Sequence, residues 1–255
     1  MTGAELTGGA EPGWLSEPAE PGECARYEFA VRALGAAVQV RTWAPARTKD
    51  DEALPLLVVH DGPEYDSRAS LTRYLAAGVT AGRLPRLRAA LLDPGSRDRW
   101  YSASARYARA LALTVVPGLT GRVATTTTIG MGTSLGALAM LHAHCRYPGL
   151  ASALFLQSGS FFRPVHDRHE RRFSYYQRVA AFVTAVPADP GRPVPVVLTC
   201  GSAEQNLPSN RAMAAVLAGS GYPATLHEVA GGHDWTAWRD AFDPHLTGLL
   251  RQAAR

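Results

Sequence analysis

Hydrophobic residues along the chain fall into short continuous runs, which alternate with longer stretches where they recur at helical spacing. The short runs are typical of parallel β-strands buried on both faces, and the longer stretches of amphipathic helices. We therefore expect an α/β fold with a mostly parallel central sheet flanked by helices. The predicted strands are Leu54–His60, Leu87–Leu92, Thr125–Gly130, Ala153–Gln157, Val194–Cys200 and Thr225–Val229, and the predicted helices are Arg68–Ala81, Ala103–Val116, Leu135–Arg146, Ser174–Ala185, Ser209–Ala218 and Thr236–Arg251.

The N-terminal part of the chain has a different pattern. Residues 1–23 are rich in Gly, Pro, Glu and Ala without periodicity, which predicts a flexible leader. Two stretches of β-forming residues, Tyr27–Val31 and Ala37–Ala44, then flank a glycine-containing turn and predict an antiparallel hairpin. Because 255 residues lie at the upper end of the length of one domain, we expect residues 24–255 to form a single domain.

Composition and charge narrow the classes of function. The 26 basic residues exceed the 22 acidic ones only slightly, and the arginines are scattered, so we expect no nucleic-acid partner. No apolar run approaches the ~18 residues of a membrane span, and the N-terminus lacks a basic start followed by an apolar stretch. Three widely spaced cysteines suggest neither disulfides nor a zinc ribbon. These features predict a cytoplasmic protein that does not associate with membranes.

A candidate nucleophile lies between a predicted strand and a predicted helix. Residues 132–136 read G-T-S-L-G and match G-x-S-x-G, the motif of a serine on a tight strand-to-helix turn. The motif alone is weak evidence, but its position gives it mechanical meaning. Small residues on both sides let the strand and the helix approach closely and expose the Ser134 hydroxyl. We expect the backbone N–H of Leu135, at the helix N-terminus, to stabilise a developing oxyanion.

A serine nucleophile requires a base and an acid that orients the base. His233 follows the last predicted strand in a loop with two glycines, and we expect it to be the base. The acid lies between serine and histidine in the chain order of α/β-hydrolases, which favours Glu204, directly after the penultimate strand. Asp234 is the alternative acid, although its side chain normally diverges from that of its neighbour His233.

The second oxyanion donor is expected in the loop after the first long strand. Pro63 has no N–H group, so we expect Glu64 or Tyr65 to supply the donor.

Four segments of the chain carry recognisable motifs: Val58–Gly62, Ile129–Ala137, Gln157–Ser160 and Gly231–Trp235, the last followed by Trp238-Arg239. Together they resemble the enterochelin esterase-like branch of the α/β-hydrolases, the esterase D type of serine hydrolase. The resemblance covers about Leu54 to Leu250 and implies that Ser134, His233 and Glu204 are nucleophile, base and acid. It implies that the substrate is a siderophore-type or other small ester or lactone, and that the protein needs neither a cofactor nor a metal. His60, Tyr65, Trp100 and Trp235 are expected to bind substrate.

Two alternative functions stay open. The segment Arg99–Ser102 resembles secreted mycolyltransferases of the same fold, which implies acyl transfer by the same three residues. A binding protein that kept the fold and lost catalysis is the other alternative.

The segment 161–177 follows a strand end and is a candidate lid. His166 and His169 within it have a spacing found in metal sites, but a charged, solvated loop is the better interpretation. The oligomeric state is left open.

Overall fold

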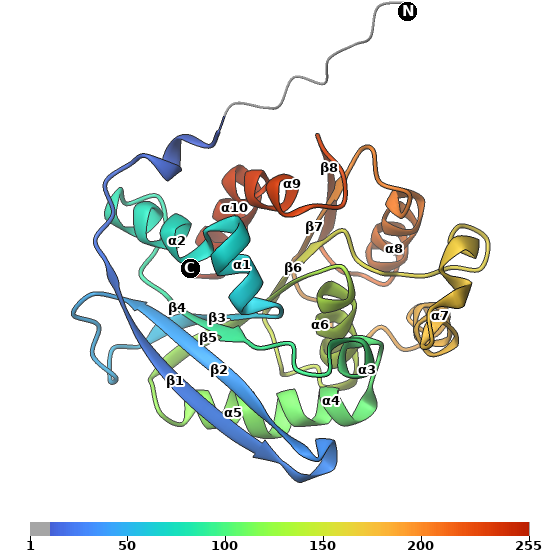
Figure 1. Ribbon diagram of the computed structural model, residues 1–255, viewed down its shortest axis with the longest axis horizontal. Helices are drawn as coiled ribbons and strands as arrows, with labels where there is room; N and C mark the ends of the chain where they lie inside the picture. Colours follow the sequence, from blue (N-terminus) through green and yellow to red (C-terminus); the bar gives the residue numbers. More distant parts are fainter. Residues whose placement is uncertain (1–10, 255) are drawn as a thin grey trace, which may run out of the picture.

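The computed structural model describes residues 11–254, which fold around one eight-stranded sheet (Figure 1). The strand order is β1-β2-β4-β3-β5-β6-β7-β8. β1 pairs antiparallel with β2, and β2 with β4, whereas all other neighbours are parallel. The predicted mostly parallel sheet and N-terminal hairpin are thus confirmed. The strands are β1 (Gly22–Val31), β2 (Ala36–Pro45), β3 (Leu54–Val59), β4 (Arg88–Leu92), β5 (Thr125–Thr133), β6 (Ala153–Gln157), β7 (Val196–Gly201) and β8 (Ala224–Val229).

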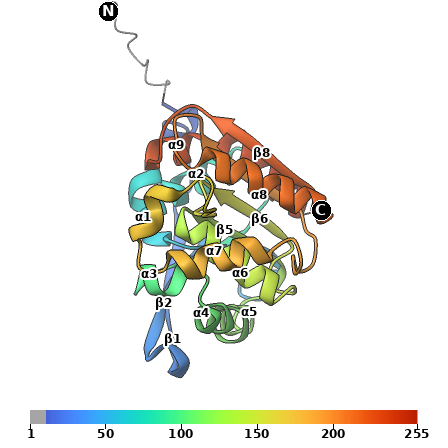
Figure 2. The ribbon, with the colours of Figure 1, turned by 90° about the vertical axis from the view of Figure 1, so that its right-hand side faces the viewer.

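Helices cover both faces of the sheet, and β3 shows why its apolar run is continuous. Leu56 and Val58 join one hydrophobic core, while Leu57 and Val59 join a second core on the other face. Figure 2 shows β8 and the β1–β2 hairpin at opposite borders of the molecule. The α-helices are α1 (Gly62–Ala69), α2 (Leu71–Thr80), α3 (Arg97–Tyr101), α4 (Ala105–Ala110), α5 (Val116–Thr120), α6 (Leu135–Arg146), α7 (Tyr176–Ala185), α8 (Leu207–Gly219), α9 (Trp235–Asp240) and α10 (Thr247–Ala253), and the shorter helical turns are η1 (Gly13–Leu15), η2 (Arg32–Leu34), η3 (Leu111–Val115), η4 (Arg168–Arg172) and η5 (Phe242–Leu246).

Two long predicted helices are divided in the structure. The one predicted over 68–81 is α1 followed by α2, because Ser70 between them is left-handed at φ 54°. The Asp66 carboxylate accepts a hydrogen bond from the Thr72 N–H at 3.1 Å, which supports the new helix start. The helix predicted over 236–251 is interrupted where Asp243 is extended, at φ −110° and ψ 124°. These breaks come from local polar contacts and backbone geometry that hydrophobic periodicity does not report.

Part of the stretch predicted as a flexible leader is packed on the domain. Residues 1–10 lie outside the described residues. Trp14 is buried, with its ring edge-on to Tyr74 of α2 at 5.3 Å between centroids. The Arg73 guanidinium donates to the Leu15 carbonyl at 3.1 Å. Burial of a large indole ring therefore fixes this described part of the leader against α2.

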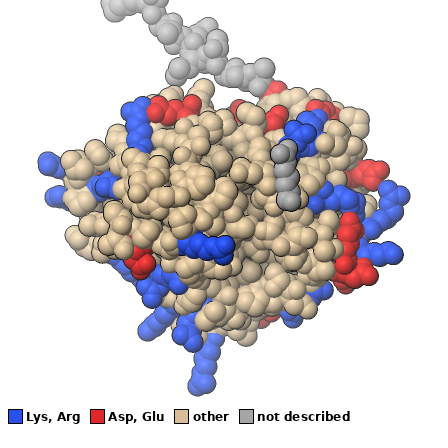
Figure 3. All heavy atoms as spheres, turned by 180° about the vertical axis from the view of Figure 1, so that it is seen from behind, with Lys and Arg blue, Asp and Glu red and all other residues tan. Residues whose placement is uncertain are grey.

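Much of the face shown in Figure 3 carries neither Lys and Arg nor Asp and Glu, and charged side chains of both signs lie mainly toward its borders. The expected absence of a nucleic-acid partner stays a prediction. Among residues 11–254, no helix has both the length and the apolar character needed to cross a membrane.

Candidate active site

Ser134 occupies the sharp turn between β5 and α6. Its backbone lies at φ 54° and ψ −122°, a strained conformation for a residue with a side chain. The flanking glycines are required by close packing, since a Cβ on Gly132 would lie 2.5 Å from the Gly136 carbonyl carbon. The turn therefore directs the Ser134 hydroxyl away from β5 and α6. It also places the Leu135 N–H in the first turn of α6, where N–H groups have no partner within the helix.

His233 lies in the loop between β8 and α9, and its ring reaches Ser134. The distance from His233 Nε2 to Ser134 Oγ is 3.1 Å. Gly231 in the same loop has φ 115°, a conformation that favours glycine. The His233 side chain is 42% exposed, so the imidazole is accessible from solvent while it contacts the serine.

Glu204 follows β7 and approaches the other ring nitrogen of His233. Its Oε2 lies 2.6 Å from His233 Nδ1, and its side chain is only 1% exposed. The Glu204 Oε1 accepts a hydrogen bond from the Gly201 N–H at 2.7 Å. Asp234 is directed elsewhere, because its carboxylate caps α9 by accepting from the Thr236 and Ala237 N–H groups, each at 3.0 Å. The structure thus brings Glu204, not Asp234, to the histidine.

A second hydroxyl contacts the candidate nucleophile. Ser160 Oγ lies 3.2 Å from Ser134 Oγ, and the Ser160 N–H donates to the Ser134 carbonyl at 3.1 Å. Sequence reasoning missed this contact and used Ser160 only as part of a family motif. Its position shortly after the end of β6, the strand beside β5, is the signal that indicates proximity to Ser134.

Two helix N-termini meet beside Ser134. α6 begins at Leu135, and α1 begins after Asp61, close enough that a Cβ on Gly136 would lie 2.9 Å from Asp61 Oδ2. The Tyr65 N–H donates to the Asp61 carbonyl within α1 at 2.9 Å. Tyr65 is therefore the weaker candidate for the second oxyanion donor, and the first-turn N–H of Glu64 is the better one.

The start of α1 is held by an ion pair between the buried Asp61 and the half-buried Arg97, which the sequence did not indicate. Asp61 is left-handed at φ 52° and 2% exposed. Arg97 donates to its two carboxylate oxygens at 2.7 and 2.9 Å. Burial raises the pKa of Asp61, and the hydrogen bond and charge of Arg97 oppose that rise. The bidentate pair fixes the start of α1, whose first turn carries the Glu64 N–H.

Three residues predicted to bind substrate are instead buried in the protein interior. His60 packs against Tyr101 at 4.6 Å between ring centroids, and burial lowers its pKa to about 3. Tyr65 donates its hydroxyl hydrogen to Gln157 Oε1 at 2.8 Å, and Trp100 stacks on Tyr107. All three are at most 3% exposed, so their side chains support the site from within. Sequence reasoning placed His60 at a strand end, Tyr65 in the loop after it and Trp100 in a family-like segment, but did not resolve on which side of the backbone each side chain packs.

Trp235 and the candidate lid lie nearer the surface. Trp235 is half-buried, with its ring edge-on to Trp238 at 4.8 Å between centroids. In the segment 161–177, Phe161 and Phe162 are buried, whereas η4 is exposed apart from the half-buried Glu170. Asp167 ties the segment to α8 by accepting from Ser209 Oγ at 2.5 Å. Within the described part of the chain, no three His, Cys, Asp or Glu side chains are grouped so as to hold a metal ion.

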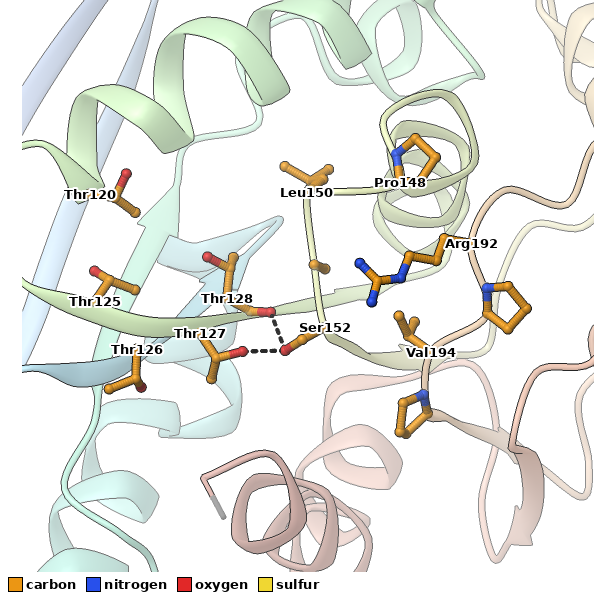
Figure 4. A pocket seen from close by; sticks show the side chains of 14 residues that line it. Thr120, Thr125, Thr126, Thr127, Thr128, Pro148, Leu150, Ser152, Arg192 and Val194 are labelled. Carbon is orange, nitrogen blue, oxygen red and sulfur yellow. Dashed lines mark hydrogen bonds between the residues drawn. The ribbon is translucent and has the colours of Figure 1, made fainter.

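A hollow of about 600 Å³ lies at the opposite end of the sheet, near the amino ends of β5, β6 and β7. Figure 4 shows Thr125–Thr128 along β5, with Arg192 extending toward Ser152 across the space. The Thr127 and Ser152 hydroxyls hydrogen-bond to each other. None of the residues that line this hollow belongs to the Ser134 site.

Comparisons with known proteins match most of the chain. A family model described as "Putative esterase" matches residues 32–249. The chain is 28% identical over 235 residues to the iron(III) enterobactin esterase of Dickeya dadantii (strain 3937), with 85% of the chain and 54% of that protein covered. The chain thus spans about half the length of this curated relative.

Solved structures show the same fold at lower sequence identity. The enterobactin esterase from Shigella flexneri, crystallised in the presence of enterobactin, has a TM-score of 0.79 at 20% identity, covering 96% of this chain and 63% of that one. A ferulic acid esterase has a TM-score of 0.73 at 15% identity, covering 91% and 98%. These likenesses show an α/β-hydrolase fold, as the sequence predicted.

Proposed function

Because the chain belongs to the esterase family whose model matches residues 32–249, we propose that it is a carboxylic ester hydrolase that works through an acyl-enzyme. One observation carries the proposal: Ser134, His233 and Glu204, far apart in sequence, form a continuous chain of hydrogen bonds at 3.1 and 2.6 Å. This is the arrangement that activates a serine hydroxyl in unrelated hydrolases.

The first half of the reaction forms the acyl-enzyme. His233 Nε2 takes the proton of the Ser134 hydroxyl as Oγ attacks the ester carbonyl carbon. Glu204 holds the ring through Nδ1 and stabilises the imidazolium by its charge. The N–H groups of Leu135 and Glu64 are proposed to donate to the oxyanion of the tetrahedral intermediate. The C–O bond to the alcohol then breaks, and the imidazolium returns the proton to the leaving oxygen.

The second half of the reaction releases the acid. His233 removes a proton from a water molecule, whose oxygen attacks the acyl carbon, and Ser134 Oγ leaves with the proton that His233 returns. The products are one carboxylic acid and one alcohol for each ester and water consumed. Every proton moves between the substrate, water and two side chains, so the proposed cycle uses no cofactor.

The named relative supports a small-molecule ester as substrate. The Dickeya dadantii protein is named for iron(III) enterobactin, so we propose a siderophore-type or other small ester or lactone for this chain as well. The three cysteines are free thiols, which supports the proposed cytoplasmic location.

The test is hydrolysis of p-nitrophenyl esters from acetate to decanoate by the wild type and Ser134→Ala. We expect release of p-nitrophenol by the wild type that is lost in the variant, together with covalent labelling of Ser134 by a fluorophosphonate. Activity of Ser134→Ala equal to that of the wild type would overturn the proposal. Ester products formed with an added alcohol, in place of free acid, would indicate an acyltransferase.

A further inference from the structure

The turn after β6 contacts the candidate acid from the side opposite to His233. Ser158 is 1% exposed and left-handed at φ 48°. Its hydroxyl donates to Glu204 Oε1 at 2.6 Å and accepts from Trp238 Nε1 at 2.8 Å. The hydroxyl therefore has one donor and one acceptor partner, and both are buried. Glu204 thus accepts from the buried Ser158 hydroxyl through Oε1 and contacts the His233 ring through Oε2.

Trp238 contacts both members of the Glu204–His233 pair. Its indole N–H reaches Glu204 through Ser158, and its ring stands edge-on to the His233 ring, with centroids 5.0 Å apart at 85°. The Trp238 carbonyl accepts from Gln157 Nε2 at 3.0 Å. One side chain on α9 thus limits the movement of the acid and of the base.

The backbone of the turn is itself fixed by two asparagines, Asn206 directly before α8 and Asn210 within α8. Asn206 donates to the Ser158 carbonyl at 3.1 Å. Asn210 accepts from the Gly159 N–H at 2.9 Å and donates to its carbonyl at 3.0 Å. A strained residue persists only where its surroundings determine its conformation, and these bonds supply that constraint at Ser158.

We propose that Ser158 and Trp238 are positioning residues that hold Glu204 and His233 in register with Ser134. The proposal rests on the proposed function, because it assigns how the same three residues are oriented. Without the Ser158 hydroxyl, Oε1 keeps only the Gly201 N–H, and the carboxylate can turn away from the His233 ring. A buried hydrogen bond to a charged group contributes roughly 1.5–3 kcal/mol, which corresponds to about 10- to 100-fold in rate.

The experiment measures kcat and KM for p-nitrophenyl butyrate and the rate of Ser134 labelling by a fluorophosphonate. The variants are Ser158→Ala, Ser158→Gly, which accommodates the positive φ, and Trp238→Phe, which keeps the ring against His233. The matched control is Thr247→Val, since Thr247 on α10 also carries a buried hydroxyl that donates to a carboxylate, that of Asp243 at 2.8 Å, and lies outside the hydrogen-bonded chain of Ser134, His233 and Glu204.

We expect both Ser158 variants to lower kcat and the labelling rate by about 10- to 100-fold with KM within about twofold. Trp238→Phe should lower them by roughly 3- to 10-fold, and Thr247→Val should not change them. The low-field proton resonance of the His233–Glu204 hydrogen bond should shift or broaden in the first three variants and persist in the control.

A double-mutant cycle separates positioning from general destabilisation. If Ser158 acts through Glu204, Ser158→Ala should have almost no further effect in a Glu204→Ala background. Wild-type rates in both Ser158 variants, or an equal loss in the Glu204→Ala background, would overturn the positioning role while leaving the esterase proposal intact. Failure of the esterase proposal is recognised separately, by wild-type activity of Ser134→Ala.

Discussion

The two ends of the parallel sheet differ in what they bring together. At the carboxyl end, Ser134, His233 and Glu204 form one hydrogen-bonded chain beside the partly buried Asp61–Arg97 ion pair. At the amino end, a hollow of about 600 Å³ is lined by threonine hydroxyls and the exposed Arg192, and no comparable chain of titratable side chains crosses it in the described residues (Figure 4).

Chain direction explains the difference better than the size of the hollow. In a parallel sheet, each helix begins near the carboxyl end of the preceding strand, so helix N-termini and their free N–H groups gather there. α6 and α1 start at that end, after β5 and β3. α6 ends at Arg146, near the hollow, where helix carbonyls predominate. Stabilisation of a developing anion is therefore favoured at one end only.

The sharpest test of the comparison removes the two reacting side chains. Ser134→Ala and His233→Ala should each lower kcat/KM for p-nitrophenyl butyrate by about 10⁴-fold or more, because the members of a triad act as a unit. Circular dichroism and thermal unfolding of both variants check that the fold persists. Retention of more than about a tenth of the activity in a folded variant would argue against chemistry at this end.

The next largest effect distinguishes the two candidate acids. Glu204→Ala should lower kcat/KM by about 10²- to 10⁴-fold, because His233 loses its buried carboxylate partner. Asp234→Ala should change kcat/KM by less than about fivefold and lower the free energy of unfolding by about 1 kcal/mol, because Asp234 caps α9. Ester hydrolysis assays and urea unfolding measure the two effects. The reverse ranking of the activities would make Asp234 the acid.

A buried histidine at the carboxyl end should make stability depend on pH. His60 lies at the carboxyl end of β3, and burial lowers its pKa to about 3. In the unfolded chain the His60 ring binds a proton near pH 6.5, whereas in the folded protein it does so only near pH 3. The contribution of His60 to the free energy of unfolding is therefore fully present above pH 6.5. It falls as the pH is lowered from 6.5 to about 3, by up to about 1.4 kcal/mol per pH unit.

Urea unfolding of the wild type and His60→Gln between pH 7 and 4 measures this effect. We expect a shallower decline for the variant, since it lacks the ring that must protonate on unfolding. His144, on α6 near the amino end, contacts the Arg192 carbonyl at 2.8 Å, and burial lowers its pKa too, so His144→Gln is the matched comparison. Parallel declines for wild type and His60→Gln would contradict the assignment.

The smallest expected effect lies at the amino end. Arg192→Ala should leave kcat/KM within about twofold of the wild type, because the side chain is exposed and lines the hollow opposite to Ser134. The same ester assay measures it. A loss of tenfold or more would mean that the two ends are coupled.

Local pattern was sufficient where one element determines the outcome. Strand β6 and helix α6 have the predicted bounds, because their apolar residues are continuous or helically spaced and few polar contacts compete. The position of Ser134 followed from the same pattern, since G-x-S-x-G has meaning only between a strand and a helix. Glu204 and His233 followed from strand order and from the family resemblance.

The division of the long helices was outside the reach of local pattern. Ser70 breaks one predicted helix through a left-handed backbone, and Asp66 supports the next helix start from six residues away. Hydrophobic periodicity continues across such a break, because both new helices bury apolar faces against the same core. Only the Ser70 backbone and the Asp66–Thr72 hydrogen bond show that one helix ends here and another begins.

The sequence by itself determined the α/β architecture, the turn that presents Ser134, and the strand ends from which His233 and Glu204 project. Only the tertiary structure decided that His60, Tyr65 and Trp100 pack inward, that Arg97 pairs with Asp61, and that Ser158 and Trp238 meet across 80 residues of chain. The physical reason is range. Periodicity and turn geometry act over a few residues, whereas contacts between side chains depend on strand order and on which face each helix buries.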